Sequence, residues 1–190
     1  MTSRKPSAAG HSLLLVDDDR LVLSTLAHAL TAAGYSVSTA ESSEEAENWL
    51  ASGKQRPQLA ILDVRMSGHD GLTLARRLHE LDHIPFMMLS AYSDPATVEQ
   101  ASQQGALSYA LKHIDPAQLI PAIEAALARA NELQALRTER QQLQTALDNE
   151  RAINLAVGMT MVQHHLRRQA AFELLRQRAR SQQRKLGDLA

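Results

Sequence analysis

An alternation of short apolar runs with amphipathic runs across residues 12–120 constrains the fold more than any other feature. The apolar runs have the length of buried strands and comprise residues 12–16, 35–40, 59–62, 84–90 and 106–111. Helical spacing follows each run, with helix start or stop signals at Gly34, Ser42, Asp94-Pro95 and Asp115-Pro116. Five such units with short links predict an α/β domain with a doubly wound, five-stranded parallel sheet.

Polar side chains stand at the carboxyl ends of four of these strands. They are Asp17, Asp18, Asp63, Ser90 and Lys112. Ligands of an open parallel sheet bind beyond these strand ends, so we expect the five side chains to share one edge. Most of these residues have a simpler role when taken alone. Asp17 or Asp18 would cap the first helix, Ser90 would be a hydroxyl at a strand end, and Lys112 would be a solvated side chain. Their joint placement favours a binding site.

The residue types at this edge point to metal and phosphate chemistry. Three carboxylates in one place raise one another's pKa unless a cation lies among them. Mg²⁺ prefers oxygen ligands and is the natural counter-ion for Asp17, Asp18 and Asp63. Lys112 and Ser90 could then hold a phosphoryl group beside the metal.

Several short motifs occur in order over residues 12–130. They are Leu14-Leu15-Val16-Asp17-Asp18-Asp19, Leu62-Asp63 with Met66, Gly68 and Asp70-Gly71, Leu89-Ser90-Ala91, and Gly105-Ala106 with Tyr109 and Lys112. Together they resemble the receiver domain of two-component response regulators, which has a flavodoxin-like fold. The resemblance implies that Asp63 accepts a phosphoryl group from a histidine kinase. It also implies that Asp18, Asp63 and the backbone carbonyl of Arg65 bind Mg²⁺, with Asp17 acting through water.

The resemblance assigns further roles and shows two departures. Lys112 would contact the phosphoryl oxygens, Ser90 would hydrogen-bond one of them, and Tyr109 would turn inward when Ser90 moves. The family usually has proline where this chain has Ser67 and His113. The proline that usually follows the lysine would allow a cis peptide bond, which costs about 3 kcal/mol when the next residue is not proline. With His113 at this position we expect the cis bond to be lost and Lys112 to be aimed less well than in the family.

The helical pattern continues from residue 120 without a Gly or Pro between Pro121 and Gly158. Pro121 is expected to kink this helix or to mark its first turn. An apolar seam with Arg140 at one position is formed by Leu133, Leu136, Leu143 and Leu147. A long helix with no core of its own predicts a weak coiled coil over residues 120–150 and a parallel homodimer. A solvated helical linker is the alternative.

The C-terminal stretch is basic and helical. Residues 151–190 carry 8 Lys/Arg and 2 Asp/Glu, against 9 and 14 in residues 1–120. Helices over residues 153–165 and 169–181, with a short third one over residues 182–190, predict a small three-helix domain. A polyanion-binding face is supplied by Arg167, Arg168, Arg176, Arg178, Arg180, Arg184 and Lys185. A merely solvated basic face is the alternative.

The motifs of this stretch are Ala156-Val157-Gly158, Ala171-Phe172-Glu173-Leu174-Leu175-Arg176 and Arg184-Lys185-Leu186-Gly187. They resemble the ANTAR module of transcription antiterminators over residues 151–190, although Val157 replaces the usual Lys. The resemblance implies an RNA-binding unit that recognises paired stem-loops in nascent leader RNA. Phe172 is the only aromatic residue of this stretch, and we expect it in the core. Recognition would then depend on phosphate contacts, RNA shape and arginine stacking.

The chain has no Cys and no apolar run of about 20 residues, so disulfides, thiolate metal sites and a membrane span are not expected. A reducing cytoplasm is the simplest location. We interpret the chain as a regulator, not an enzyme, that binds leader RNA so that a terminator hairpin does not form. The alternatives are a tail that docks an acidic protein partner and a tail that binds DNA.

Overall fold

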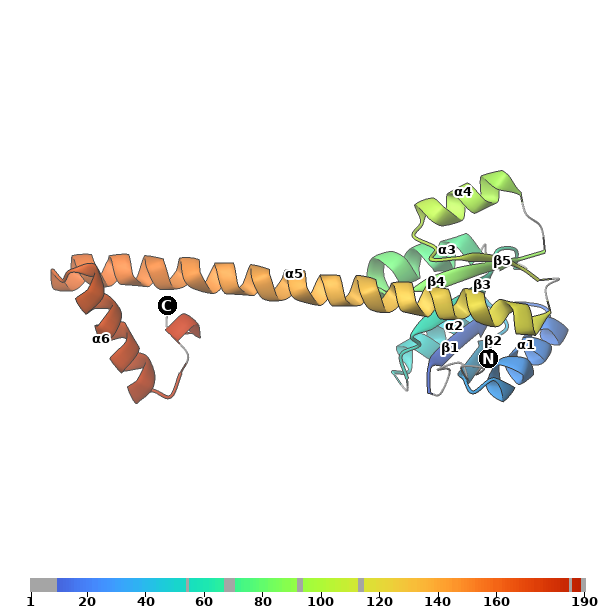
Figure 1. Cartoon of the computed structure of the whole chain (residues 1–190), viewed down its shortest axis with the longest axis horizontal. Helices are drawn as coiled ribbons and strands as arrows, with labels where there is room; N and C mark the ends of the chain where they lie inside the picture. Colours follow the sequence, from blue (N-terminus) through green and yellow to red (C-terminus); the bar gives the residue numbers. More distant parts are fainter. Residues whose placement is uncertain are drawn as a thin grey trace, which may run out of the picture. The chain divides into compact units, whose positions relative to one another are not determined.

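The computed structural model describes residues 10–53, 55–66, 71–91, 94–112, 115–184 and 186–188. Contacts divide the chain into two units, Met1–Leu133 and Gln134–Ala190, and the longest helix contributes to both. The elements in Figure 1 are β1 (Ser12–Val16), α1 (Arg20–Ala32), β2 (Ser36–Ala40), α2 (Ser43–Ala51), β3 (Leu59–Asp63), α3 (Gly71–Arg77) with its π-helical end η1 (Leu78–Asp82), β4 (Phe86–Ser90), α4 (Pro95–Gln103), β5 (Tyr109–Leu111), α5 (Pro116–His164), α6 (Arg168–Ser181) and the 3-10 turn η2 (Leu186–Asp188).

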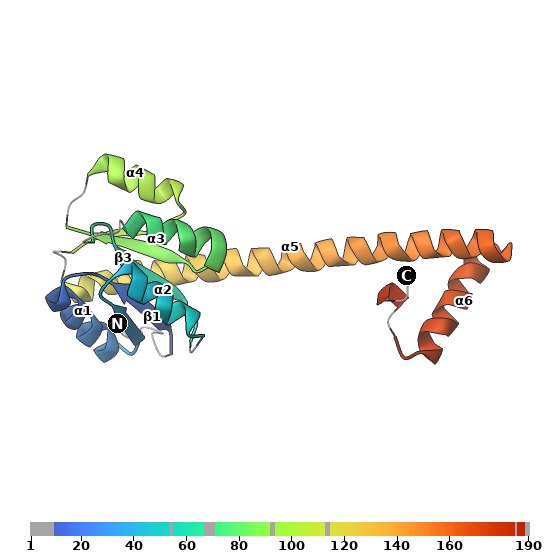
Figure 2. The same ribbon diagram turned by 180° about the vertical axis from the view of Figure 1, so that it is seen from behind.

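The first unit contains a five-stranded parallel sheet with strand order β2-β1-β3-β4-β5. The first turns of α5 and helix α1 cover one face, and α2, α3 and α4 cover the other (Figure 1, and from behind in Figure 2). The order reverses between β1 and β3, and ligands of open parallel sheets bind beyond the carboxyl ends of the strands at such a point. The predicted doubly wound parallel sheet is therefore confirmed.

Both faces of the sheet are buried, which explains why its central strands are apolar except at their end residues Ser12, Asp63 and Ser90. Leu13, Leu15 and Ile61 pack in the cluster that includes α1 and α5. Their neighbours Leu14 and Leu62 point to the opposite face and pack in the cluster that includes α2, α3 and α4. Side chains therefore alternate between the two faces with a period of two. β1 and β3 are paired in the register that sets Leu15 beside Ile61.

Helix starts follow their capping residues. Asp19 is the N-cap of α1, and its carboxylate accepts hydrogen bonds from the backbone N–H of Leu21 and Val22. Ser42 caps α2 by accepting from the N–H of Glu45 at 3.1 Å. The Glu45 carboxylate accepts from the N–H of Glu41, whereas in a standard capping box it would accept from the N–H of the next residue, Ser42. Of the three N-terminal aspartates, Asp19 is thus the one that caps the helix.

Helix α5 is 49 residues long and includes Pro121, so the helix does not begin there. It joins the predicted coiled-coil segment to the helix expected separately over residues 153–165. No residue between Pro121 and Gly158 interrupts it, and Gly158 is tolerated inside it. In the described part of the chain no helix, α5 included, is both long and apolar enough to cross a membrane.

The second unit consists of the end of α5, helix α6 and the turn η2. Val157 and Thr160 of α5 are buried, as are Ala171 and Ala179 of α6. The expected third helix is not present over the described residues, where only the single turn η2 forms. Gln183 takes a left-handed backbone conformation, with φ of 54°, and this ends the helical path after α6.

Candidate functional site: a carboxylate and lysine cluster at the carboxyl edge of the sheet

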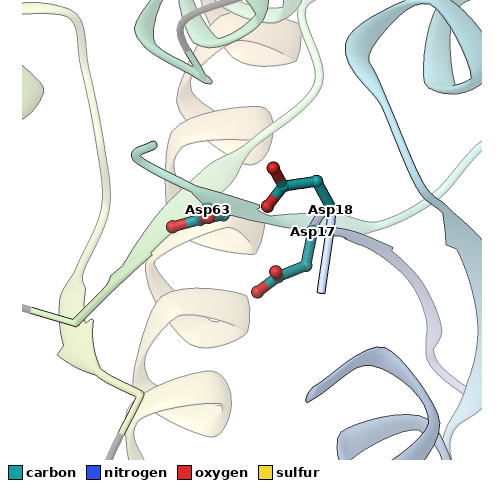
Figure 3. Close-up of side chains that lie close together, drawn as sticks. All are labelled: Asp17, Asp18 and Asp63. Atoms are coloured by element: carbon teal, nitrogen blue, oxygen red, sulfur yellow. The ribbon is translucent and has the colours of Figure 1, made fainter. Parts of the chain in front are cut away.

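Three aspartates come together where β1 and β3 end. Asp17 and Asp18 follow β1, and Asp63 is the last residue of β3, the neighbouring strand. Figure 3 shows their carboxylates grouped at this edge, and one carboxylate oxygen from each lies within 4.8 Å of the others. Asp17 is fully buried and Asp63 is 3% exposed, whereas Asp18 is the most exposed of the three. The structure thus joins residues that lie far apart in the sequence.

Lys112 joins this cluster from the end of β5. Its Nζ lies 2.7 Å from Oδ2 of Asp17 and 2.8 Å from Oδ2 of Asp63. The backbone N–H of Lys112 donates to the carbonyl of Ser90 at 2.7 Å, which fixes the start of the lysine side chain beside β4. One ammonium group therefore bridges two nearly buried carboxylates.

Backbone amides hold the second oxygen of each buried carboxylate. Oδ1 of Asp17 accepts from the N–H of Asp19 at 2.9 Å, and Oδ1 of Asp63 accepts from the N–H of Arg65 at 3.2 Å. These bonds orient the remaining oxygens toward Lys112. Charge-assisted hydrogen bonds of this kind favour the ionised form of a carboxylate.

The electrostatics of the cluster set burial against charge pairing. Burial raises the pKa of Asp63, and the nearby Asp17 charge adds to this, while Lys112 and the Arg65 N–H lower it; the result is a raised pKa. Burial alone would lower the pKa of Lys112, but its bonds to Asp17 and Asp63 outweigh this and raise it. Lys112 is therefore charged at neutral pH.

The residues present fit a magnesium ion. With Asp17, Asp18 and Asp63 ionised, the single ammonium of Lys112 leaves two negative charges in the cluster. The donors are all hard carboxylate oxygens, which suit Mg²⁺ better than a softer metal. Burial is the main cause of the raised pKa of Asp63, and a divalent ion would offset the repulsion from Asp17 that adds to it.

Gly71 belongs to the site, and the sequence alone does not show why glycine is required at this position. It opens α3, and its N–H donates to the carbonyl of Val64 at 3.2 Å. A Cβ atom at this position would overlap the carbonyl oxygen of Asp63. Only glycine lets the chain pass this close behind the aspartate. The sequence motif includes Gly71, but the contact that requires it is visible only in three dimensions.

Ser90 and Tyr109 lie on the strands next to Asp63. Ser90 ends β4, is 5% exposed, and follows Leu89, which pairs with Asp63 in the sheet. Tyr109 begins β5 opposite Met88 and is half-buried against the cluster under α3 and α4. The two positions that depart from the family motif, Ser67 and His113, lie outside the described residues.

The arginines singled out in the C-terminal stretch are all on or beside α6 and are exposed. They are Arg167, Arg168, Arg176, Arg178, Arg180 and Arg184. A guanidinium nitrogen of Arg168 donates to Oδ1 of Asn154 on α5 at 2.8 Å. Arg176 lies 3.5 Å from the carboxylate of Glu173. Lys185 lies outside the described residues.

A doubly wound sheet with carboxylates and a lysine at its carboxyl edge defines the receiver class of α/β domain. Residues 13–124 match the response regulator receiver domain, and residues 141–190 match the ANTAR domain. The chain belongs to the response regulator receiver family and carries a C-terminal ANTAR domain.

Two curated relatives show how far the similarity extends. The transcriptional regulatory protein PdtaR of Mycobacterium tuberculosis is 29% identical over 178 residues, covering 94% of this chain and 86% of PdtaR. The transcriptional regulatory protein AfsQ1 of Streptomyces coelicolor is 36% identical over 118 residues, covering 62% of this chain and 52% of AfsQ1. The similarity to PdtaR therefore includes both units, whereas that to AfsQ1 covers a smaller part of the chain.

Solved structures resemble the receiver part. The N-terminal domain of a response regulator/sensory box/GGDEF protein from Carboxydothermus hydrogenoformans has a TM-score of 0.58 and 30% identity, covering 65% of this chain and 98% of that chain. A response regulator from Thermotoga maritima has a TM-score of 0.56 and 26% identity, covering 63% and 98%. These likenesses agree with the receiver fold of the first unit.

Proposed function

We propose that this protein is a response regulator that is phosphorylated on Asp63 by a histidine kinase and controls transcription antitermination by binding structured leader RNA. One observation supports this above the others: a carboxylate–lysine cluster of receiver type and six exposed arginines in an ANTAR domain occur on one chain. The proposed division is a receiver over residues 12–130, a connector over 120–150 and an RNA-binding domain over 151–190. The proposed ligand is nascent RNA, and the proposed place of action is the cytoplasm.

In the phosphoryl transfer, a carboxylate oxygen of Asp63 attacks the phosphorus of a phosphohistidine. The P–N bond breaks, its electron pair returns to the imidazole, and an acyl phosphate forms on Asp63. Mg²⁺, held by Asp18, Asp63 and the carbonyl of Arg65, with Asp17 through water, would neutralise charge on the phosphoryl oxygens. Arg65 already directs its N–H to Asp63, which orients the attacking group.

The residues around Asp63 would respond to the new phosphoryl group. Lys112, now 2.8 Å from the Asp63 carboxylate, would bind a phosphoryl oxygen instead. The hydroxyl of Ser90 would donate to another oxygen, and Tyr109 would turn toward the space that Ser90 leaves. This series of movements would carry the signal from β3 to β5.

A second copy of the chain is the proposed partner of the connector. Leu136, Leu143 and Leu147 are 55%, 61% and 51% exposed on the isolated helix, and Leu133 is partly exposed beside them. Leucines at this spacing are buried when two helices form a coiled coil. A homodimer would also present two RNA-binding units, which suits a target with two stem-loops.

The receiver half of the proposal is tested by phosphate uptake. We expect the full chain, incubated with a small phosphodonor and Mg²⁺, to gain one phosphate by mass spectrometry, and Asp63→Asn to gain none. Asp19→Asn is the matched control, because Asp19 is exposed, lies next to Asp18 in the sequence and caps α1. This variant should gain phosphate like the wild type. Equal uptake by Asp63→Asn and the wild type would refute the assignment of Asp63.

The RNA half is tested by titrating a two-hairpin RNA and a duplex DNA at several salt concentrations. We expect tighter binding to the RNA, and each of Arg167→Ala, Arg176→Ala and Arg184→Ala at a phosphate contact should flatten the salt dependence by about one unit of slope. Tighter binding to DNA would favour a DNA-binding regulator. No affinity for either nucleic acid, with Asp63 phosphorylated or not, would favour a tail that docks a protein.

A further inference from the structure

The ring of Phe172 is exposed, although the sequence predicts it in the core. Phe172 is 37% exposed, whereas its neighbour Ala171 is fully buried. The buried line of α6 consists of Ala171 and Ala179, with Leu175 half-buried between them. Phe172 follows Ala171 by one residue and is therefore turned by about 100° around the helix. Small alanines therefore form the buried line of α6, and the large ring lies outside this line.

Two arginines lie on the same side of α6 as Phe172. Arg168 and Arg176 are four residues before and after it, and residues at this spacing are neighbours on a helix surface. Arg168 is held in place by its hydrogen bond to Asn154. The side chain of Arg176 is 49% exposed and forms an ion pair at 3.5 Å with Glu173, itself 52% exposed. A phosphate can replace such an exposed ion pair at little cost. The result is an aromatic ring with a guanidinium group one turn away on each side.

We propose that Phe172 is a stacking platform for an unpaired base of the target RNA, with Arg168 and Arg176 binding the phosphates on either side. This inference depends on the proposed RNA-binding function and names the residue that would distinguish a looped RNA from a fully paired one. Unpaired bases stack on exposed aromatic rings, and arginines bind the phosphates that flank them. A protein partner would instead need a wider apolar face, and the neighbours four residues before and after the ring, Arg168 and Arg176, are both charged.

Leu174 offers a matched control on the same helix. It is 38% exposed, which is almost the same as Phe172, but two residues further on it points to a different side of α6. Both side chains are apolar, and both positions lie away from the ends of α6. A change at Leu174 therefore reports any general effect of altering an exposed apolar residue of α6.

The experiment uses the full chain and a two-hairpin RNA whose loops carry the fluorescent adenine analogue 2-aminopurine, compared with the same stems closed without unpaired purines. We expect wild-type protein to change the fluorescence of the loop and to prefer the looped RNA. Phe172→Leu should bind the looped RNA about tenfold more weakly and abolish the preference, because one base stacked on an aromatic ring contributes on this order. Phe172→Tyr and Leu174→Ala should bind like the wild type.

The outcomes separate this inference from the proposed function. If wild-type protein binds the looped RNA while Phe172→Leu binds equally well with the same fluorescence change, RNA binding stands and the stacking role of Phe172 is wrong. The role is equally wrong if Phe172→Leu alters only the sedimentation of the protein, which would assign the ring to a protein contact. If wild-type protein binds no RNA, both the inference and the proposed function fail. If circular dichroism shows Phe172→Leu unfolded, the loop fluorescence with wild-type protein decides, and no change there overturns the proposal.

Discussion

The Nζ of Lys112 lies 2.8 Å from Oδ2 of Asp63, and the side chains of the two residues are 14% and 4% exposed. The lysine also pairs with Asp17, so it is the ammonium that the structure places between the two carboxylates. The group proposed to bind the phosphoryl oxygens is thus already held against the proposed acceptor. Phosphorylation would move Lys112 by exchanging one anionic partner for another.

The first prediction concerns Lys112→Met in metal-free buffer. Removing the ammonium leaves two buried carboxylates without their partner, and we expect the free energy of unfolding to fall by about 3 kcal/mol. Mg²⁺ should recover more stability in this variant than it adds to the wild type, because it supplies the missing positive charge. Urea unfolding with Mg²⁺ and with a chelator measures both effects. Arg129→Met is the control: it breaks an exposed pair with Glu132 and should cost less than about 1 kcal/mol. Equal losses in the two variants would contradict the prediction.

The second prediction concerns pH and Asp63→Asn. Burial raises the pKa of Asp63 in the folded protein above its ordinary value of 3.8. The folded state therefore binds this proton more tightly than the unfolded state, and ionised Asp63 costs stability above its folded pKa but not below 3.8. Without metal, Asp63→Asn should be more stable than the wild type at neutral pH. This advantage should shrink as the pH falls through the folded pKa toward 3.8. An advantage that grows on acidification, measured by urea unfolding, would show that the pKa is lowered instead.

The third prediction compares two glycines. Gly71→Ala should destabilise the receiver by about 2 kcal/mol or more and slow phosphate uptake, because its Cβ would displace the Asp63 carbonyl. Gly158→Ala should instead stabilise the protein by about 0.5–1 kcal/mol, since Gly158 lies inside α5 with open space around it. Thermal unfolding and phosphate uptake of the two variants are the measurements. A tolerated Gly71→Ala would mean that the chain behind Asp63 has room to shift.

The fourth prediction concerns the connector. Leu136→Asp/Leu143→Asp should convert the dimer to a monomer in sedimentation velocity, because charges would enter the apolar seam. The control, Gln134→Asp/Gln141→Asp, places the same two charges at the same spacing on the polar side of the helix and should leave the dimer intact. Arg140 at the seam makes the wild-type dimer weak, so sedimentation must be measured at protein concentrations that extend above the micromolar range. Identical species for the wild type and the leucine variant would rule out the coiled coil.

Most of the receiver could be predicted from the sequence because its local and tertiary signals agree. Asp94-Pro95 and Asp115-Pro116 mark true helix starts, and β1 spans the predicted residues. The carboxylates at the strand ends could be placed together because a parallel sheet brings its carboxyl ends to one edge. What the sequence did not reveal was how the cluster is held, since the Arg65 N–H and the close approach of Gly71 depend on backbone geometry.

The second unit was harder to predict because it buries little surface. The buried positions of α6 are the small residues Ala171 and Ala179, so a pattern that ranks residues by size wrongly placed Phe172 inside. The segment after α6 was expected to form a helix, but Gln183 turns the chain and only η2 follows in the described residues. Short helices depend on tertiary contacts more than on propensity, and these contacts are not visible in the sequence.

The most direct test of the account is to sequence the RNA that copurifies with the full chain after Asp63 has been phosphorylated. The wild type should enrich leader segments that contain two neighbouring hairpins followed by a terminator. A variant that combines Arg167→Ala, Arg176→Ala and Arg184→Ala should lose this enrichment. If the wild type retains no specific RNA, or the arginine variant retains the same RNAs to the same extent, the protein is not an antiterminator that reads RNA through α6.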